Sequence, residues 1–215
     1  TVDALRAEGL VDLMRPARLN GSELDYLALL DVVEEVATAC ASTAWVLTNL
    51  ISCTLMAAYF PPQAQADVWD ELPDALLAGS LIFAGGTARP VEGGYELVGR
   101  WPLVSGCSHA DWLVLGALVE GVEGSAGYRM LLVPRTDWVV HDTWDAAGLR
   151  GTGSHDVEVA GTVVPTHRSI AVDDTKGGPS PGSDANPGWL YALPLFGLFA
   201  TWIGAVMLGI ARAAV

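Results

Sequence analysis

A hydroxyl group, a cluster of small residues and a strand meet between Tyr95 and Asp111, in YELVGRWPLVSGCSHAD. The alternating residues before Trp101 predict a strand, and Pro102-Leu103-Val104 then lead into the polar cluster Ser-Gly-Cys-Ser. A strand that ends in this way offers the Ser105 hydroxyl and several backbone N–H groups at one point. Such a surface suits a flat ligand with a polar edge.

Other familiar chemistries lack their motifs in this sequence. It contains no Gly-x-Ser-x-Gly, no phosphate-binding loop and no His-Glu-x-x-His. The Gly-x-Gly at residues 151–153 precedes a predicted strand, which argues against a dinucleotide-binding turn. The four histidines are widely separated and show no metal-ligand spacing, so we predict no metal site. Glu34 and Glu35 are expected on the solvated face of a helix.

The composition limits the partners and the compartment. The net charge is -14, from 25 acidic and 11 basic residues, and an acidic surface repels nucleic acid. The three cysteines are odd in number and widely spaced, which favours free thiols over disulfides. The first residues show no signal-peptide pattern. Together these features predict a cytoplasmic protein.

The elements that must position Ser105 begin with helices. Helical spacing of apolar residues predicts helices over residues 2–14 and 24–40, the second capped by Ser22. The next stretch, ASTAWVLTNLISCTLMAAYF, begins with a Ser42 or Thr43 cap and is apolar nearly all round, as a central helix would be. A short helix is expected over residues 63–69.

The period changes to about two from residue 75 to residue 172. Six stretches predict strands that form a compact β-barrel or sandwich: ALLAGSLIFAG, TARPVEGGYELVGRW, DWLVLGALV, YRMLLVPRT, WVVHDTW and HDVEVAGTVVP. Gly93-Gly94 predicts a hairpin turn within the second stretch. The predicted domains are therefore an N-terminal helical part, 1–74, and a middle β part, 75–172.

The remaining sequence predicts a linker and a very apolar helix. Residues 173–188, DDTKGGPSPGSDANPG, have the composition of a mobile or surface-crossing linker. Residues 185–211 carry no charge, so their length alone would permit a membrane span. Pro187 and Pro194 interrupt the stretch and no basic cluster precedes it, which favours a helix buried in a protein bundle, 189–215.

Four stretches in this order resemble one known family. They are VVEEVATACASTAWVL, GGYELVGRWPLVSGCSHADW, WDAAGLRGTGSHDVEVAGTVVP and LPLFGLFATWIGAVMLGIARAAV. They are similar to the oxygenase components of two-component flavin-dependent monooxygenases, such as 4-hydroxyphenylacetate hydroxylase, which are built on the acyl-CoA dehydrogenase fold. The resemblance covers nearly the whole chain.

The resemblance implies an α+β fold of an N-terminal helical domain, a middle β-barrel and a C-terminal helical bundle, of which this chain holds the first helix. It also implies that reduced flavin, FMNH2 or FADH2, arrives from a separate reductase. The flavin would react with O2 to give a C4a-hydroperoxyflavin, which hydroxylates a small, usually aromatic substrate. Family members are commonly homotetramers.

The same resemblance implies a set of site residues. Ser105 corresponds to the hydroxyl that contacts the flavin near N5, and Ser80 corresponds to a small polar residue beside substrate and flavin. Other expected flavin contacts lie around Ser105 and in the LRGTGS turn: Trp101, Leu103, Val104, Gly106, Arg150, Thr152 and Ser154. Each has a structural alternative, since Trp101 suits a core position, Ser105 and Ser80 suit strand positions, and LRGTGS suits a tight turn.

Two departures from the family pattern keep alternatives open. Phenol hydroxylases often carry a His in the central helix, but NLISCTLMAAYF has Ser52, Cys53 and Thr54 there. The Glu-Pro-Gly-x-Gly-Ser-Asp run of acyl-CoA dehydrogenases is also absent, which lowers the expectation of a thioester dehydrogenase. A third reading is a non-catalytic or truncated oligomerisation module, favoured by the end of the chain at Val215.

Overall fold

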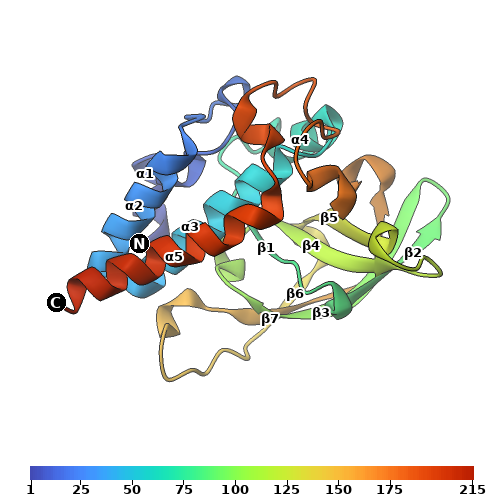
Figure 1. The fold of residues 1–215 in the computed structure, drawn as a ribbon. Coiled ribbons are helices and arrows are strands. Elements are labelled where there is room, and N and C mark those ends of the chain that lie inside the picture. Colours follow the sequence, from blue (N-terminus) through green and yellow to red (C-terminus); the bar gives the residue numbers. More distant parts are fainter.

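The computed structural model describes residues 1–215 and places its helices beside a single β-sheet (Figure 1). The helices are α1 (Val2–Ala7), α2 (Tyr26–Ala39), α3 (Ala41–Ala57), α4 (Pro62–Trp69) and α5 (Leu195–Ala213). Although α5 is far from α2 and α3 in sequence, the three helices lie side by side. Buried residues of the helices and of the sheet form one continuous hydrophobic core.

The sheet has eight strands in a mixed arrangement. They are β1 (Leu77–Ser80), β2 (Gly86–Val91), β3 (Gly94–Val104), β4 (Trp112–Val119), β5 (Tyr128–Pro134), β6 (Val139–His141), β7 (His155–Pro165) and β8 (Ser169–Ala171). The order is β6-β7-β3-β2-β4-β5-β8, and β1 pairs in parallel with the first half of β4. This order places β6 and β8 at opposite ends.

The strand predictions are confirmed at the level of elements. All six stretches contain strands, and the second holds both β2 and β3, which Gly93 joins with φ +81°. Strand β8 is not predicted from the sequence, because its three residues are too few to show an alternating pattern. Pairing of β3 with both β2 and β7 makes it an interior strand that fixes the position of its own C-terminal end.

Three details of the helix predictions were wrong. The helix expected over residues 2–14 ends at Ala7, because Gly9 adopts φ +70° and a short 3-10 turn follows. The cap of α2 is Asp25, whose carboxylate accepts the Leu27 N–H at 2.8 Å, and not Ser22. No side chain caps α3, which begins at Ala41, one residue before the predicted cap.

The central helix α3 is buried on most of its surface, as its apolar sequence predicts. It packs against α2, α5 and β1. Gly79 on β1 permits this close approach, since a Cβ there would lie 2.4 Å from the Val114 carbonyl oxygen and 3.1 Å from Cys53 Sγ. The helix therefore stands between the sheet and the other helices.

The segment at 173–188 crosses the surface of the helical part and is fixed there. Asn186 is buried, and its side-chain amide donates to the Ala58 carbonyl at 2.8 Å. Its Oδ1 accepts from Arg18 Nε at 2.8 Å, and the Gly182 N–H donates to the Tyr59 carbonyl. These contacts determine where the chain enters α5.

One face of α5 packs on α2 and the other is open. Gly209 allows the two helices to meet closely, because a Cβ there would lie 2.2 Å from the Glu34 carbonyl oxygen. Glu34, which was expected to be solvated, forms an ion pair with Arg212 of α5. Exposed apolar side chains remain at Phe196, Ile203, Met207 and Leu208. The helix is long and apolar enough to cross a membrane by length and composition alone, a test that core helices of soluble proteins also pass.

Candidate functional site

A bulge near the end of β3 presents Leu103 to the surface. Trp101 pairs with Val157 of β7, but the next pairing joins Val104 to His155, so β3 contains one extra residue. Leu103 in this bulge has φ +60° and is 58% exposed. A left-handed conformation costs a leucine about 1–2 kcal/mol. The strained and exposed Leu103 is therefore a candidate contact for a ligand or for a neighbouring part of the protein.

Trp101 and Val104, which stand before and after Pro102-Leu103, face the interior. Trp101 and Val104 have no exposed surface. The Trp101 indole donates to the Gly116 carbonyl at 2.7 Å, and its ring packs where a Cβ on Gly86 would lie. The side chains of Trp101 and Val104, both expected to contact flavin, therefore support the strand from inside.

Ser105, the residue after Val104, belongs to a chain of hydrogen bonds. Its Oγ accepts from the Trp45 indole N–H of α3 at 3.0 Å and lies 2.8 Å from Ser154 Oγ. Ser154 Oγ lies 2.7 Å from Thr152 Oγ1, which donates to the Leu149 carbonyl at 2.9 Å. We call these five groups the hydroxyl chain. The structure thus brings together three residues predicted for the site, Ser105, Thr152 and Ser154, and all three are buried.

The backbone of two tight turns holds the hydroxyl chain in place. The Gly106 N–H donates to the Thr152 carbonyl at 3.1 Å, which ties the end of β3 to the LRGTGS turn. Gly106 has φ +76°, a conformation that suits glycine. Arg150 of the same turn points elsewhere, since its exposed guanidinium donates to the Ala146 carbonyl and pairs with Asp145.

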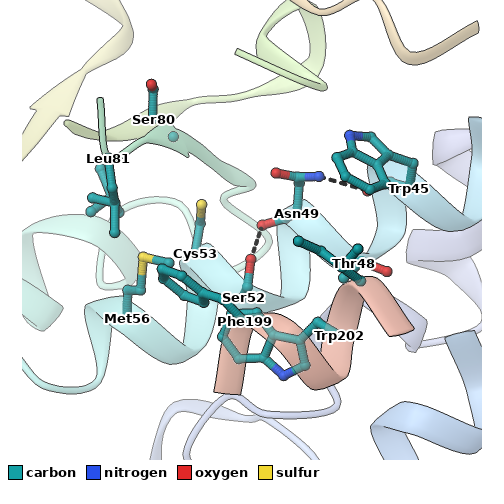
Figure 2. Close-up of a pocket in the computed structure, with 13 residues that line it drawn as sticks. Trp45, Thr48, Asn49, Ser52, Cys53, Met56, Ser80, Leu81, Phe199 and Trp202 are labelled. Carbon is teal, nitrogen blue, oxygen red and sulfur yellow. Dashed lines mark hydrogen bonds between the residues drawn. The ribbon is translucent and has the colours of Figure 1, made fainter. Parts of the chain in front are cut away.

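A cavity of about 200 Å³ shares Trp45 with the hydroxyl chain. Figure 2 shows the residues that line this cavity. The cavity is bounded by α3, the β1 region and α5. The residues of α3 that line it share one face: Trp45, Thr48, Asn49, Ser52, Cys53 and Met56. The other walls come from Gly79, Ser80, Leu81, Val114, Phe199, Trp202 and Ile203. The cavity is therefore largely apolar and partly aromatic.

Three polar side chains of the α3 wall each donate one hydrogen bond to the backbone of their own helix. Asn49 Nδ2 donates to the Trp45 carbonyl at 2.8 Å, which leaves its Oδ1 as an acceptor. Ser52 Oγ donates to the Asn49 carbonyl at 2.9 Å (Figure 2). Thr48 Oγ1 donates to the Ala44 carbonyl at 2.8 Å. This wall consequently offers a ligand the Asn49, Ser52 and Thr48 oxygens as acceptors and the second Asn49 N–H as a donor.

Two further side chains complete the chemistry of the cavity. Ser80, predicted for the site, is among the lining residues, but its hydroxyl points away from the α3 wall (Figure 2) and accepts the Ile82 N–H at 3.4 Å. Burial raises the pKa of the Cys53 thiol to about 12, so it stays protonated near neutral pH. The cavity wall therefore carries no charge.

The sequence analysis missed Trp45, Asn49 and the aromatic residues of α5. A signal for the first two exists in the sequence. Trp45, Thr48, Asn49 and Ser52 recur at helical spacing in an otherwise apolar helix, which indicates one polar face. Nothing in the sequence of α5 indicates that Phe199 and Trp202 would face that stripe.

Comparison with known proteins finds chains that are similar to this one. No family model matches the chain. The FADH(2)-dependent resorcinol hydroxylase oxygenase component of Rhizobium sp. (strain MTP-10005) is 36% identical over 99% of the chain and 52% of its own length. The flavin-dependent monooxygenase oxygenase subunit HsaA of Rhodococcus jostii (strain RHA1) is 34% identical over the whole chain and 56% of its own length.

This chain is similar over its whole length to oxygenase components of flavin-dependent monooxygenases. The crystal structure of 3-HSA hydroxylase from Rhodococcus sp. RHA1 superposes with a TM-score of 0.94 over 99% of this chain and 55% of that one, at 34% identity. XiaF from Streptomyces sp., in complex with FADH2 and glycerol, gives a TM-score of 0.86 at 32% identity. The resemblance read from the sequence is confirmed, and the acyl-CoA dehydrogenase-like fold is shared. The chain spans about half the length of these relatives.

A flavin fits the residues that this chain contributes. The exposed Leu103 offers an apolar surface to a flat ring, and the neighbouring Ser105 offers a hydroxyl to a polar edge. The strained conformation of Leu103 is the observation on which this fit rests.

Proposed function

We propose that the intact protein is the oxygenase component of a two-component monooxygenase that uses reduced flavin and O2 to hydroxylate a small aromatic substrate. The observation that carries the proposal is the position of Trp45, whose indole donates a hydrogen bond to Ser105 and also lines the apolar cavity. A cofactor edge and a substrate would therefore lie on two sides of one side chain. Bound reduced flavin would give O2 two electrons, with one oxygen atom entering the substrate and the other leaving as water.

The residues of this chain would bind and orient the reactants. Ser105 holds the edge of the flavin ring and Leu103 covers part of its face, while Gly106 and Thr152 fix the position of Ser105. Ser80 contributes to the wall of the cavity on its β1 side. Arg150 and the side chains of Trp101 and Val104 have no part in this proposal, because they point elsewhere or lie inside the core.

The substrate we propose is a neutral ring that carries an O–H or N–H donor. The apolar walls suit the ring, and the acceptors at Asn49 and Ser52 suit the donor. A carboxylate in this wall region would be desolvated with no cationic partner, at a large cost. Without a basic residue on this wall, a phenol would bind in its neutral form.

The wider organisation follows the family resemblance. We propose an N-terminal helical domain over 1–74, a middle β-barrel domain over 75–172, a connecting segment over 173–188 and the first helix of a bundle over 189–215. The open apolar face of α5 supports assignment to a bundle. We also propose a separate flavin reductase as partner, a cytoplasmic homotetramer, and no association with membrane or nucleic acid.

A single-turnover experiment tests this function. The intact protein is mixed anaerobically with chemically reduced FAD or FMN and a panel of phenols and indoles, then with O2, and products are analysed by mass spectrometry. We expect a product that is heavier than its substrate by one oxygen atom, labelled when 18O2 is used. Conversion of all the O2 to hydrogen peroxide with every substrate would contradict the proposal. If the purified protein held a tightly bound flavin that acyl-CoA bleaches, it would instead be a dehydrogenase. The names of its relatives do not support that activity.

A further inference from the structure

The hydroxyl chain has a direction, because its last member can only accept. The Leu149 carbonyl oxygen has no proton, so the Thr152 hydroxyl must donate across the 2.9 Å that separate them. If the Thr152 hydroxyl pointed elsewhere, the lone pairs of Thr152 Oγ1 and the Leu149 oxygen would face each other at this distance with no hydrogen between them. The Thr152 proton is thus committed to Leu149.

The same reasoning determines the donor in each of the other contacts of the chain. Since Thr152 has used its proton, Ser154 must donate to Thr152 in the contact at 2.7 Å. Since the Ser154 proton is then engaged with Thr152, Ser105 must donate to Ser154 in the contact at 2.8 Å. The Trp45 indole can only donate, and it gives its proton to Ser105 at 3.0 Å. Every hydrogen in the chain points from Trp45 toward Leu149.

This direction determines what Ser105 can offer a ligand. A serine hydroxyl has one proton and two acceptor lone pairs. The proton goes to Ser154 and one lone pair takes the Trp45 N–H. A single acceptor lone pair remains. Ser105 is only 5% exposed, so water competes little for this position.

We propose that Thr152 and Ser154 are positioning residues that hold Ser105 as a hydrogen-bond acceptor and so make this site select reduced over oxidised flavin. This inference rests on the proposed function. Reduced flavin carries a hydrogen on N5 and can donate it to Ser105. Oxidised flavin has a bare lone pair on N5, which would face the lone pair of Ser105. The preference for one oxidation state is thus set by two hydroxyls that need not touch the cofactor.

Substitution of Thr152 tests the direction. In Thr152→Val the Ser154 hydroxyl loses its acceptor and can turn to donate to Ser105, whose own proton is then free to point at the flavin. We expect the ratio of dissociation constants, oxidised over reduced flavin, to fall about 3- to 10-fold, the equivalent of one neutral hydrogen bond. Thr152→Ser keeps the hydroxyl and should keep the wild-type ratio. The ratio is measured on the intact protein by anaerobic titration with each form of the same flavin.

Ser154→Ala provides a second, independent variant. It removes the acceptor of the Ser105 proton directly, so the ratio should fall in the same direction. A merely structural role of Thr152 or Ser154 would weaken binding of both forms equally and leave the ratio unchanged, which would overturn the inference. Absence of flavin binding in either oxidation state by the wild-type protein would instead overturn the proposed function.

Discussion

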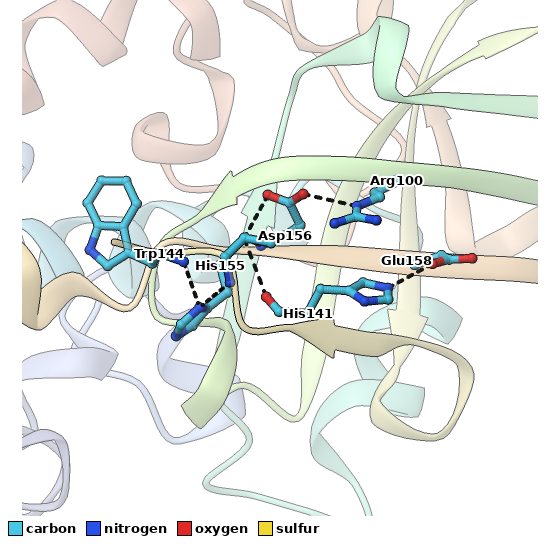
Figure 3. Close-up of polar contacts among 7 residues, drawn as sticks. Arg100, His141, Trp144, His155, Asp156 and Glu158 are labelled. Carbon is cyan, nitrogen blue, oxygen red and sulfur yellow. Dashed lines mark hydrogen bonds and ion pairs between the residues drawn. The ribbon is translucent and has the colours of Figure 1, made fainter. Parts of the chain in front are cut away.

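Two polar networks flank the start of β7, and they differ in almost every physical respect. The hydroxyl chain lies on one side, where Ser154 directly precedes β7; its three hydroxyl groups are buried and it contains no charged group. On the other side lies a group of ionisable residues that we call the charged edge: Arg100, His141, His155, Asp156 and Glu158 (Figure 3). There Arg100 donates to Asp156 at 2.9 Å, and His141 lies 2.7 Å from Glu158.

Exposure explains what each network can do. The Arg100 side chain is 49% exposed and Glu158 44% exposed, so water and salt screen their pairs. His155 joins the charged edge by accepting the N–H groups of Thr143 and Trp144 with Nδ1, both at 3.2 Å (Figure 3). The charged edge thus supports a loop, whereas only the hydroxyl chain is dry enough for the direction of each hydrogen bond to matter.

Removal of the central hydroxyl should have the largest effect on stability. In Ser105→Ala the Trp45 indole and the Ser154 hydroxyl lose a partner in a buried position, which costs about 1–3 kcal/mol of unfolding free energy. Urea denaturation of the intact protein measures the loss. Ser108→Ala, exposed on the same turn, is the control and should change stability by less than about 0.5 kcal/mol. Equal effects of the two substitutions would mean that the hydroxyl chain is not closed to water.

A substitution in the turn after Ser105 should come next. Gly106→Ala forces a side chain into φ +76° and places its Cβ 3.3 Å from Val46, and we expect a loss of about 1–2 kcal/mol. Gly121 has the same φ with nothing within 4 Å, so Gly121→Ala isolates the backbone cost. The difference between the two, measured by urea denaturation, reports the contact with Val46. A smaller loss at Gly106 than at Gly121 would contradict the tight packing of this turn on α3.

The charged edge should respond weakly to the loss of a pair. Arg100→Ala removes the partner of Asp156, and we expect a loss of at most about 1 kcal/mol of unfolding free energy, because the Arg100 side chain is half exposed. Added salt should shrink this difference but leave that of Ser105→Ala unchanged. A salt-independent loss of several kcal/mol would show that the charged edge is as dry as the hydroxyl chain.

The smallest effect is expected from pH. Of the side chains that line the cavity, only Cys53 can ionise, and burial raises its pKa to about 12. A thiol is neutral below its pKa, so the raised pKa keeps Cys53 neutral, and the cavity uncharged, at every pH below about 12. The affinity of the intact protein for indole should therefore stay constant between about pH 6 and pH 9 in equilibrium titrations. A change within that range would reveal an ionisable group at the ligand.

The sequence predicts much of the fold because its signals are local. Periodicity locates α3 and the strands, and the residues around Ser105 identify the turn that holds the hydroxyl chain. The cap at Asp25 was misplaced because Ser22 shows an equally good local pattern. The bulge at Leu103 could not be predicted, since it arises from the register between β3 and β7. The hydrogen bond between Trp45 and Ser105 joins residues 60 positions apart in the sequence, and only tertiary packing brings them together.

A crystal structure of the intact protein with reduced flavin, prepared without oxygen, tests the central claim most directly. We predict that the ring lies against Leu103, that its N5 is within hydrogen-bond distance of Ser105 Oγ, and that the Trp45 indole still donates to the same oxygen. A flavin bound away from Ser105, or a Ser105 hydroxyl that has left Trp45 and Ser154 to reach the cofactor, would contradict the account.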